Sequence, residues 1–238
     1  MIKLEKTEVV GWEHAIRGMR NPLNSWAQSD SHKCLCAILD SDCEMVMNEH
    51  EPCRECNDGE YGFCVGEKDF DLMERLRNAG TDHRKFMRML TVYVDITAPL
   101  YWFKEFDTYK VGTVANSCST MHKIHDKRFA LDDFSCEHLE DDFLHGLREV
   151  VRLLNCARDG FISAKKDENP LVPAKDYWWQ MIQLLPSSYN QKRTVMLNYE
   201  VLANMYKSRK NHKLDEWRDL CCWIESLPYS ELIVGGGN

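Results

Sequence analysis

The sequence has no long apolar run: no stretch approaches the ~18 consecutive apolar residues that a membrane-spanning helix needs. Its first residues also lack the apolar segment of a secretory signal peptide. Positive charge is not in excess, because 30 Lys and Arg against 38 Asp and Glu give a net charge of −8. A membrane protein, a secreted disulfide scaffold and a general nucleic-acid binder are therefore disfavoured, and we expect a cytoplasmic protein.

Three widespread catalytic or phosphate-binding signatures are also missing. The chain contains no G-x-S-x-G nucleophile elbow, no P-loop and no dinucleotide-binding G-x-G-x-x-G.

What the sequence does contain is typical of a globular protein. It has 238 residues, of which 44% are hydrophobic and 29% charged. That length can bury a self-sufficient core. No repeat or long linker divides it, so we expect one α+β domain over residues 1–238, with a cysteine-rich insertion at about 31–66.

Hydrophobic periodicity predicts the main elements. Strands are expected at 2–10 and 90–97, the second because apolar and polar residues alternate there. Pro99 suits the first turn of a helix over 99–106. Further helices are expected from Trp12 to Asn21, over 69–80, from 139 to about Gly160, over 176–185, over 195–209 and from 214 to before Pro228, with a loop at 161–173.

The insertion holds six of the eleven cysteines. Cys53-x-x-Cys56 has a spacing that lets two thiolates bind one tetrahedral metal ion. Cys34-x-Cys36 is one residue short of a second such pair, so the zinc candidates are Cys34, Cys36, Cys53 and Cys56. The alternatives are a variable surface loop with reduced thiols, which the sequence favours, and thiol redox chemistry.

A polar segment over 98–122 follows the second strand and carries lysines and hydroxyls. Lysines and hydroxyls at the end of a strand suit contacts to phosphate or nucleotide. His122 and His125 lie three residues apart, and exposed histidines are the alternative to a metal pair there.

The order of residues in this segment resembles the flavin-dependent thymidylate synthases. The family runs from a strand into Ala-Pro, an aromatic helix, an Arg-His-Arg triplet and a serine-containing stretch. The matching positions here are Ala98-Pro99, Lys104-Glu105, Thr108-Tyr109-Lys110, Thr113, Ser119 and His122. The spacing from Ala98-Pro99 to the triplet position has no gap.

A second block extends the resemblance to about two-thirds of the chain. The family has Leu-Pro, then Asn-x-Arg, a further Asn and an Arg, and a short segment that opens the last helix. The matching positions are Leu185-Pro186, Asn198-Tyr199-Glu200, Asn204, Arg209, His212 and Glu216. The resemblance implies the family's α+β fold, with a central, mostly antiparallel sheet flanked by helices.

Several of the family's arginines are replaced in this chain. Thr108-Tyr109-Lys110 stands in place of the Arg-His-Arg triplet, and Lys110 lacks the planar fork of arginine. Met121 and Ile182 stand where phosphate-binding arginines are expected, and Glu200 reverses a charge. Arg84, Lys192 and Arg193 are available as replacements, in positions that the sequence does not determine.

The resemblance implies the reductive methylation of dUMP to dTMP, in a homotetramer. Methylenetetrahydrofolate would supply the carbon, and FAD, with NADPH as electron donor, would supply the hydride. The alternative is a catalytically inactive or repurposed nucleotide-binding relative that keeps the fold, which the lost arginines favour.

The resemblance also implies roles for individual residues. Arg209 would be the catalytic residue, because it would contact the pyrimidine and stabilise charge that develops on it. Ser119, Lys110 and His122 would complete the substrate site. Asn204, Asn198, Lys104, Thr108 and Tyr109 would bind the flavin. The structural alternatives are a helix C-terminal cation for Arg209 and helix capping or surface polarity for the two asparagines.

Overall fold

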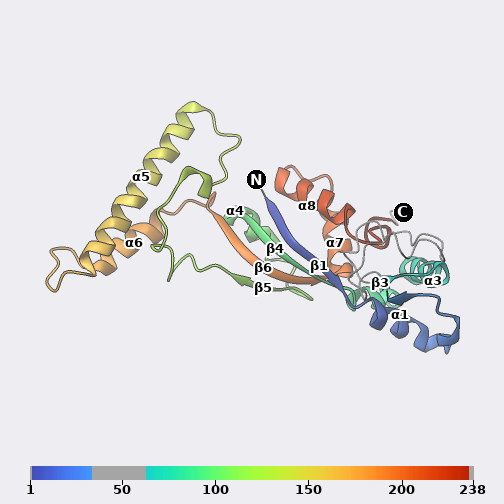
Figure 1. Ribbon diagram of the computed structural model, residues 1–238. Coiled ribbons are helices and arrows are strands. Elements are labelled where there is room, and N and C mark those ends of the chain that lie inside the picture. Colours follow the sequence, from blue (N-terminus) through green and yellow to red (C-terminus); the bar gives the residue numbers. More distant parts are fainter. Residues whose placement is uncertain (1, 34–62, 236–238) are drawn as a thin grey trace, which may run out of the picture. The chain divides into compact units, whose positions relative to one another are not determined.

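The computed structural model describes residues 2–33 and 63–235 (Figure 1). The helices and strands of its amino-terminal half are β1 (Lys3–Val10), α1 (Trp12–Arg20), η1 (Asn21–Leu23), η2 (Trp26–Gln28), β2 (His32–Lys33), β3 (Phe63–Cys64), α3 (Glu67–Asn78), η4 (Arg84–Arg88), β4 (Thr91–Pro99) and α4 (Leu100–Phe106). Those of its carboxyl-terminal half are β5 (Val114–Ser117), η5 (Leu131–Asp133), α5 (Asp141–Ala164), α6 (Ala174–Leu184), β6 (Asn190–Asn198), α7 (Tyr199–Arg209), α8 (Asp215–Glu225) and α9 (Glu231–Val234).

Four strands form the main sheet, in the order β1-β4-β6-β5. In β4 the apolar residues Val92, Val94 and Ile96 are buried, as their alternation with polar residues predicts. Asp95 is buried as well, and its carboxylate accepts a hydrogen bond from Thr194 of β6. A second, two-stranded antiparallel sheet pairs His32 with Cys64. The α+β class with an antiparallel sheet is the one that the sequence predicted.

The chain divides into two compact units by its residue contacts. Each strand of the main sheet contains one of the points at which the chain passes from one unit to the other. The hairpin unit comprises residues 1–3, 95–108 and 115–194. The helical unit comprises residues 4–94, 109–114 and 195–238. Each unit is described by itself below.

In the hairpin unit, α5 and α6 lie side by side (Figure 1). Their facing apolar side chains form one core with residues of the preceding loop. Its buried members are Ile124, Phe129, Phe134, Leu147, Leu154, Ala157, Phe161 and Met181. Burial of these side chains holds the two helices together, since helices of this length gain most of their stability from packing.

In the helical unit, α7 packs against α8, α9 and η4. Three aromatic rings join its parts: Trp12 of α1 lies edge-to-face with Tyr199 at 5.7 Å and with Tyr229 at 5.0 Å. The Tyr199 hydroxyl donates a 2.5 Å hydrogen bond to the carbonyl oxygen of Pro228.

Among the described residues, no helix has both the length and the apolar character that crossing a bilayer requires.

Most predicted elements are confirmed, and two predictions are wrong. The predicted helix over 195–209 is strand up to Asn198 and helix only from Tyr199, so Asn198 is the N-cap rather than an interior residue. The predicted end near Gly160 is also wrong, because α5 continues to Ala164. Gly160 instead admits the Tyr177 ring of α6, since a Cβ at this position would lie 2.5 Å from that ring.

Candidate functional site

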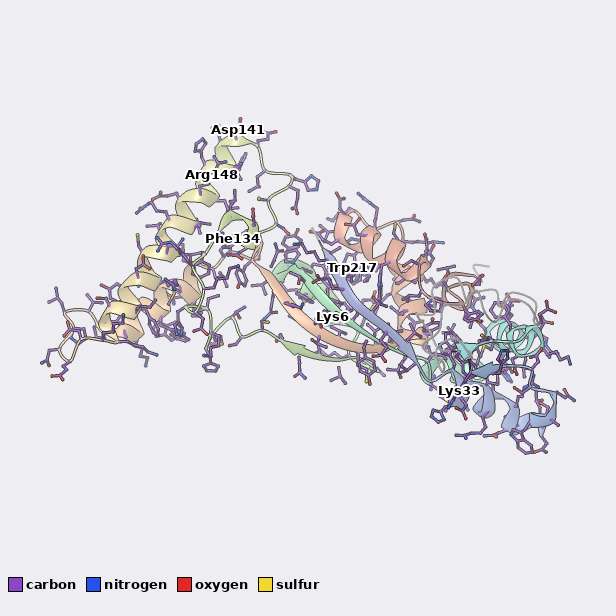
Figure 2. The ribbon with its side chains drawn as sticks, viewed as in Figure 1. Lys6, Lys33, Phe134, Asp141, Arg148 and Trp217 are labelled. Carbon is purple, nitrogen blue, oxygen red and sulfur yellow. The ribbon has the colours of Figure 1, made fainter. Side chains whose placement is uncertain are left out.

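Arg209 lies in the last turn of α7, and its guanidinium is held by two aromatic residues of the helical unit. Its Nε donates a 3.0 Å hydrogen bond to the Tyr109 hydroxyl. The guanidinium carbon lies 4.5 Å from the centre of the Trp217 ring and 5.7 Å from that of Tyr109. Trp217 is labelled on α8 in Figure 2 and is fully buried. A guanidinium fixed on two rings is preorganised to meet a ligand oxygen.

The segment around Tyr109 passes close to the start of α7. Gly112 has a φ of +79°, and a Cβ there would lie 2.8 Å from the side-chain nitrogen of Asn198. Only glycine adopts this backbone readily and leaves room for the amide. The Asn198 side-chain oxygen accepts a hydrogen bond from the Val201 N–H at 3.1 Å, so the capping role holds for this residue.

Three further polar residues lie in the same unit. Lys110 and Asn204 are exposed. The Thr113 hydroxyl oxygen is buried and has no hydrogen-bond partner among the described residues. A buried hydroxyl without a hydrogen-bond partner destabilises the folded protein, and a ligand that forms a hydrogen bond with it would remove that cost.

Glu200, at the position of a family arginine, is bound by two arginines of η4. The Arg84 Nε lies 3.3 Å from one carboxylate oxygen, and the Arg88 guanidinium donates to both. Burial raises the pKa of Glu200, but the hydrogen bonds and charges of Arg88 and Arg84 outweigh it and hold the pKa below its usual value. Arg84 is therefore engaged with Glu200.

The other two available cations are engaged in the hairpin unit. Lys192 lies 3.0 Å from a carboxylate oxygen of Asp95. Arg193 lies 2.7 Å from Asp107, with its guanidinium 3.8 Å from the centre of the Phe103 ring. Both side chains thus stabilise the region around the sheet.

The remaining predicted site residues belong to the hairpin unit. The Ser119 hydroxyl oxygen accepts hydrogen bonds from the N–H groups of Met121, at 3.2 Å, and His122, at 2.8 Å. The Thr108 hydroxyl donates to the carbonyl oxygen of Glu105 at 2.7 Å. Lys104 is exposed on α4, and His122 is exposed. Ser119 and Thr108 therefore shape their own turns.

The helical unit brings Tyr109 and Arg209 into contact and places Asn198 beside the same polar segment. Sequence reasoning missed two features of this unit, the Trp217 ring under Arg209 and the pairing of Glu200. The spacing of Arg84 and Arg88, four residues apart, was the only indication in the sequence that two arginines could pair with Glu200. The zinc candidates Cys34, Cys36, Cys53 and Cys56 lie outside the described residues, among which no group of three metal-binding side chains occurs.

Comparison with known proteins gives one kind of match. No family model and no curated protein matches the sequence. Solved structures do match: thymidylate synthase X (ThyX) from Helicobacter pylori, crystallised with FAD and dUMP, has 16% sequence identity and a TM-score of 0.59 over 98% of both chains. A second structure of flavin-dependent ThyX from Helicobacter pylori, complexed with FAD and dUMP, has 18% identity and a TM-score of 0.58 over 97% of this chain and 98% of that one. The chain therefore has the fold of the flavin-dependent thymidylate synthases.

Proposed function

We propose that the protein is a FAD-dependent thymidylate synthase-like enzyme that methylates dUMP, with methylenetetrahydrofolate as carbon donor and NADPH as electron source. The observation that carries the proposal is the guanidinium of Arg209, fixed by Tyr109 and Trp217 at the position that the family resemblance assigns to the pyrimidine contact. A cation held there would stabilise negative charge on a pyrimidine oxygen.

The donors of the helical unit fit carbonyl-rich planar rings, which both the pyrimidine and the flavin have. Asn198, Asn204 and Tyr109 would hold the flavin. Reduced flavin would supply the hydride when bound. Lys104 and Thr108 are further proposed flavin contacts, and Lys110, Ser119 and His122 proposed substrate contacts.

The test is the visible absorbance spectrum of the purified protein with added FAD and then with added dUMP. We expect a bound-flavin spectrum that changes when dUMP is added, and growth of a thymidine auxotroph that expresses the chain. Absence of bound flavin at high FAD, with a folded protein, would overturn the proposal. Light scattering would test the homotetramer that the resemblance implies.

A second candidate function is a nucleotide-binding relative without the methylation activity. The pairing of Glu200 with Arg84 and Arg88 favours it, because a carboxylate and its two partners now occupy a position where the family has a ligand-binding arginine. Binding of dUMP without bound flavin and without rescue of the auxotroph would support this candidate over the first.

A further inference from the structure

A pocket of about 450 Å³ lies in the helical unit, on residues that the proposed function does not use. It is formed by α1, η2, β2 and β3 and the short connections between them. The described residues that line it include Glu13, Arg17, Arg20, Trp26, Ser29 and Lys33. That volume is within the range of pockets that hold small-molecule ligands.

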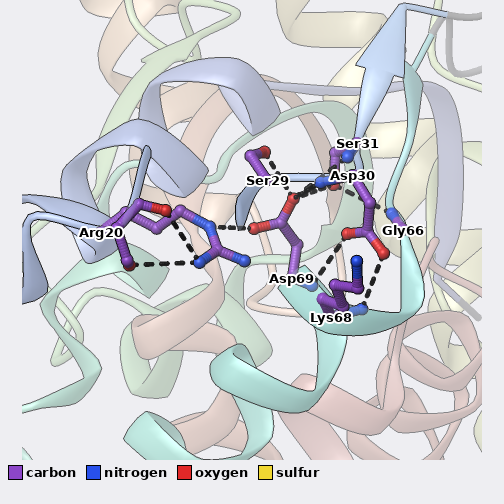
Figure 3. A network of polar contacts seen from close by, with 8 residues as sticks. Arg20, Ser29, Asp30, Ser31, Gly66, Lys68 and Asp69 are labelled. Carbon is purple, nitrogen blue, oxygen red and sulfur yellow. Dashed lines mark hydrogen bonds and ion pairs between the residues drawn. The ribbon is translucent and has the colours of Figure 1, made fainter. Parts of the chain in front are cut away.

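Arg20 lines the pocket as a buried and rigid cation. It is only 3% exposed, its Nε donates to Asp69 at 2.5 Å, and its Nη1 donates to the carbonyl and hydroxyl oxygens of Ser25, both at 3.2 Å. Figure 3 shows these contacts and no dashed line from the third nitrogen, Nη2. Nη2 has no hydrogen bond to any described residue, which leaves its N–H groups for a ligand.

The carboxylate of Asp69 fixes this orientation. It accepts hydrogen bonds from the hydroxyls of Ser29, at 2.7 Å, and Ser31, at 2.6 Å, and from the backbone N–H groups of Asp30 and Ser31 (Figure 3). Burial raises the pKa of Asp69, but these hydroxyls and Arg20 outweigh it and lower the pKa below its usual value. The partner of Arg20 therefore stays ionised at neutral pH.

A second guanidinium and an aromatic ring complete the pocket. Arg17 is exposed, touches the His14 ring nitrogen at 3.1 Å, and has no carboxylate partner among the described residues. Trp26 is 51% exposed, and its indole N–H donates to the Asn21 side-chain oxygen at 2.8 Å, which fixes the ring. Lys33 lies 3.6 Å from Glu13, and both are largely exposed.

We infer that this pocket binds a nucleoside monophosphate. The planar forks of two arginines match the oxygens of a phosphate group, and a fixed, half-exposed indole offers a stacking face for a base. Arg17 supplies the uncompensated charge, because Asp69 balances Arg20 and Glu13 lies beside Lys33. The inference does not rest on the proposed function, because none of the residues proposed there lines this pocket.

Calorimetric titration of the full-length protein with adenosine and uridine 5′-monophosphates tests the inference. We expect saturable binding of one nucleotide per chain. Arg17→Gln and Trp26→Ala should each weaken binding by about tenfold, since the first removes a charge-assisted contact to the phosphate and the second removes the stacking face for the base. Trp26→Phe should restore most of the affinity. Arg75→Gln, which removes an exposed arginine of α3 outside the pocket, is the matched control and should bind as the wild type does.

Three further arms make the outcome decisive. The nucleosides without phosphate should bind at least about tenfold more weakly, since they lack the group that the arginines recognise. Inorganic phosphate that binds as tightly as the nucleotide would overturn the role of Trp26. Nucleotide binding that Arg209→Gln abolishes and Arg17→Gln leaves intact would place it at the proposed catalytic site and overturn the inference, as would no binding at millimolar nucleotide.

Discussion

Arg209 donates a hydrogen bond to the hydroxyl of Tyr109, a residue one hundred positions earlier in the chain. The bond joins the carboxyl end of α7 to the polar segment that follows α4. Neither residue reaches the other through local structure, so the contact depends on the packing of the helical unit. It places a cation between a phenol and a buried indole, where few conformations are open to it.

On the proposed function, Arg209→Gln should weaken dUMP binding by about 10–100-fold, because one charge-assisted hydrogen bond is worth ~1.5–3 kcal/mol. Tyr109→Phe keeps the ring and loses only the hydroxyl, so we expect a smaller loss. Lys207→Gln removes an exposed cation from the same last turn and serves as the control. Equal dUMP affinities for Arg209→Gln and Lys207→Gln would show that Arg209 does not contact the nucleotide.

Glu200→Gln should destabilise the protein by about 1–2 kcal/mol at pH 7. The substitution leaves two arginines without their carboxylate, and the solvent exposure of Arg88 reduces the cost below that of a fully buried pair. The folded state lowers the pKa of Glu200. The stability that the charged carboxylate contributes is therefore present above the usual pKa of ~4.3 and is lost as the pH falls through the pKa of the folded state.

Urea unfolding of the Glu200→Gln variant and of the wild type, at pH 7 and at pH 3, measures the difference between their free energies of unfolding. Glu149→Gln breaks the exposed Glu149–Arg152 pair and serves as the control, because solvent screens this pair and its loss should leave the free energy of unfolding nearly unchanged. A Glu200→Gln variant that is as stable as wild type at pH 7 would mean that the ion pairs contribute nothing net.

Local patterns predicted most of the fold, and long-range contacts account for what they missed. The alternation in β4 and the position of Pro99 gave a strand followed by a helix, because each depends on neighbouring residues. Strand β6 was missed because the apolar residues of its second half, 195–198, fit a helical period as well, and pairing within the sheet decides between the two. The same contrast applies to the candidate site. Arg209 and Tyr109 were predicted individually from the sequence, whereas the contact of Arg209 with Trp217 depends on tertiary packing.

Asp69→Asn should cost about 3–5 kcal/mol at pH 7, because it leaves the buried Arg20 guanidinium without a countercharge. The folded state lowers the pKa of Asp69, so its contribution is present above ~3.9 and disappears as pH falls through the folded value. The melting temperatures of variant and wild type should therefore converge as the pH falls below about 4. Asp71→Asn, an exposed acid on the same helix, is the control and should track the wild type throughout.

Alanine substitutions at two glycines of α5 should change the stability of the protein in opposite directions. Gly146→Ala places a methyl group in open space and should stabilise the protein by up to about 1 kcal/mol, the difference in helix propensity. Gly160→Ala gains the same propensity but drives the methyl into the Tyr177 ring, and overpacking of this kind costs about 1–3 kcal/mol. Thermal unfolding of the two variants separates the effects, and Gly160→Ala combined with Tyr177→Ala should recover the propensity gain relative to Tyr177→Ala alone. If Gly160→Ala is as stable as Gly146→Ala, α5 and α6 do not pack at this crossing, and Gly160 has no packing role.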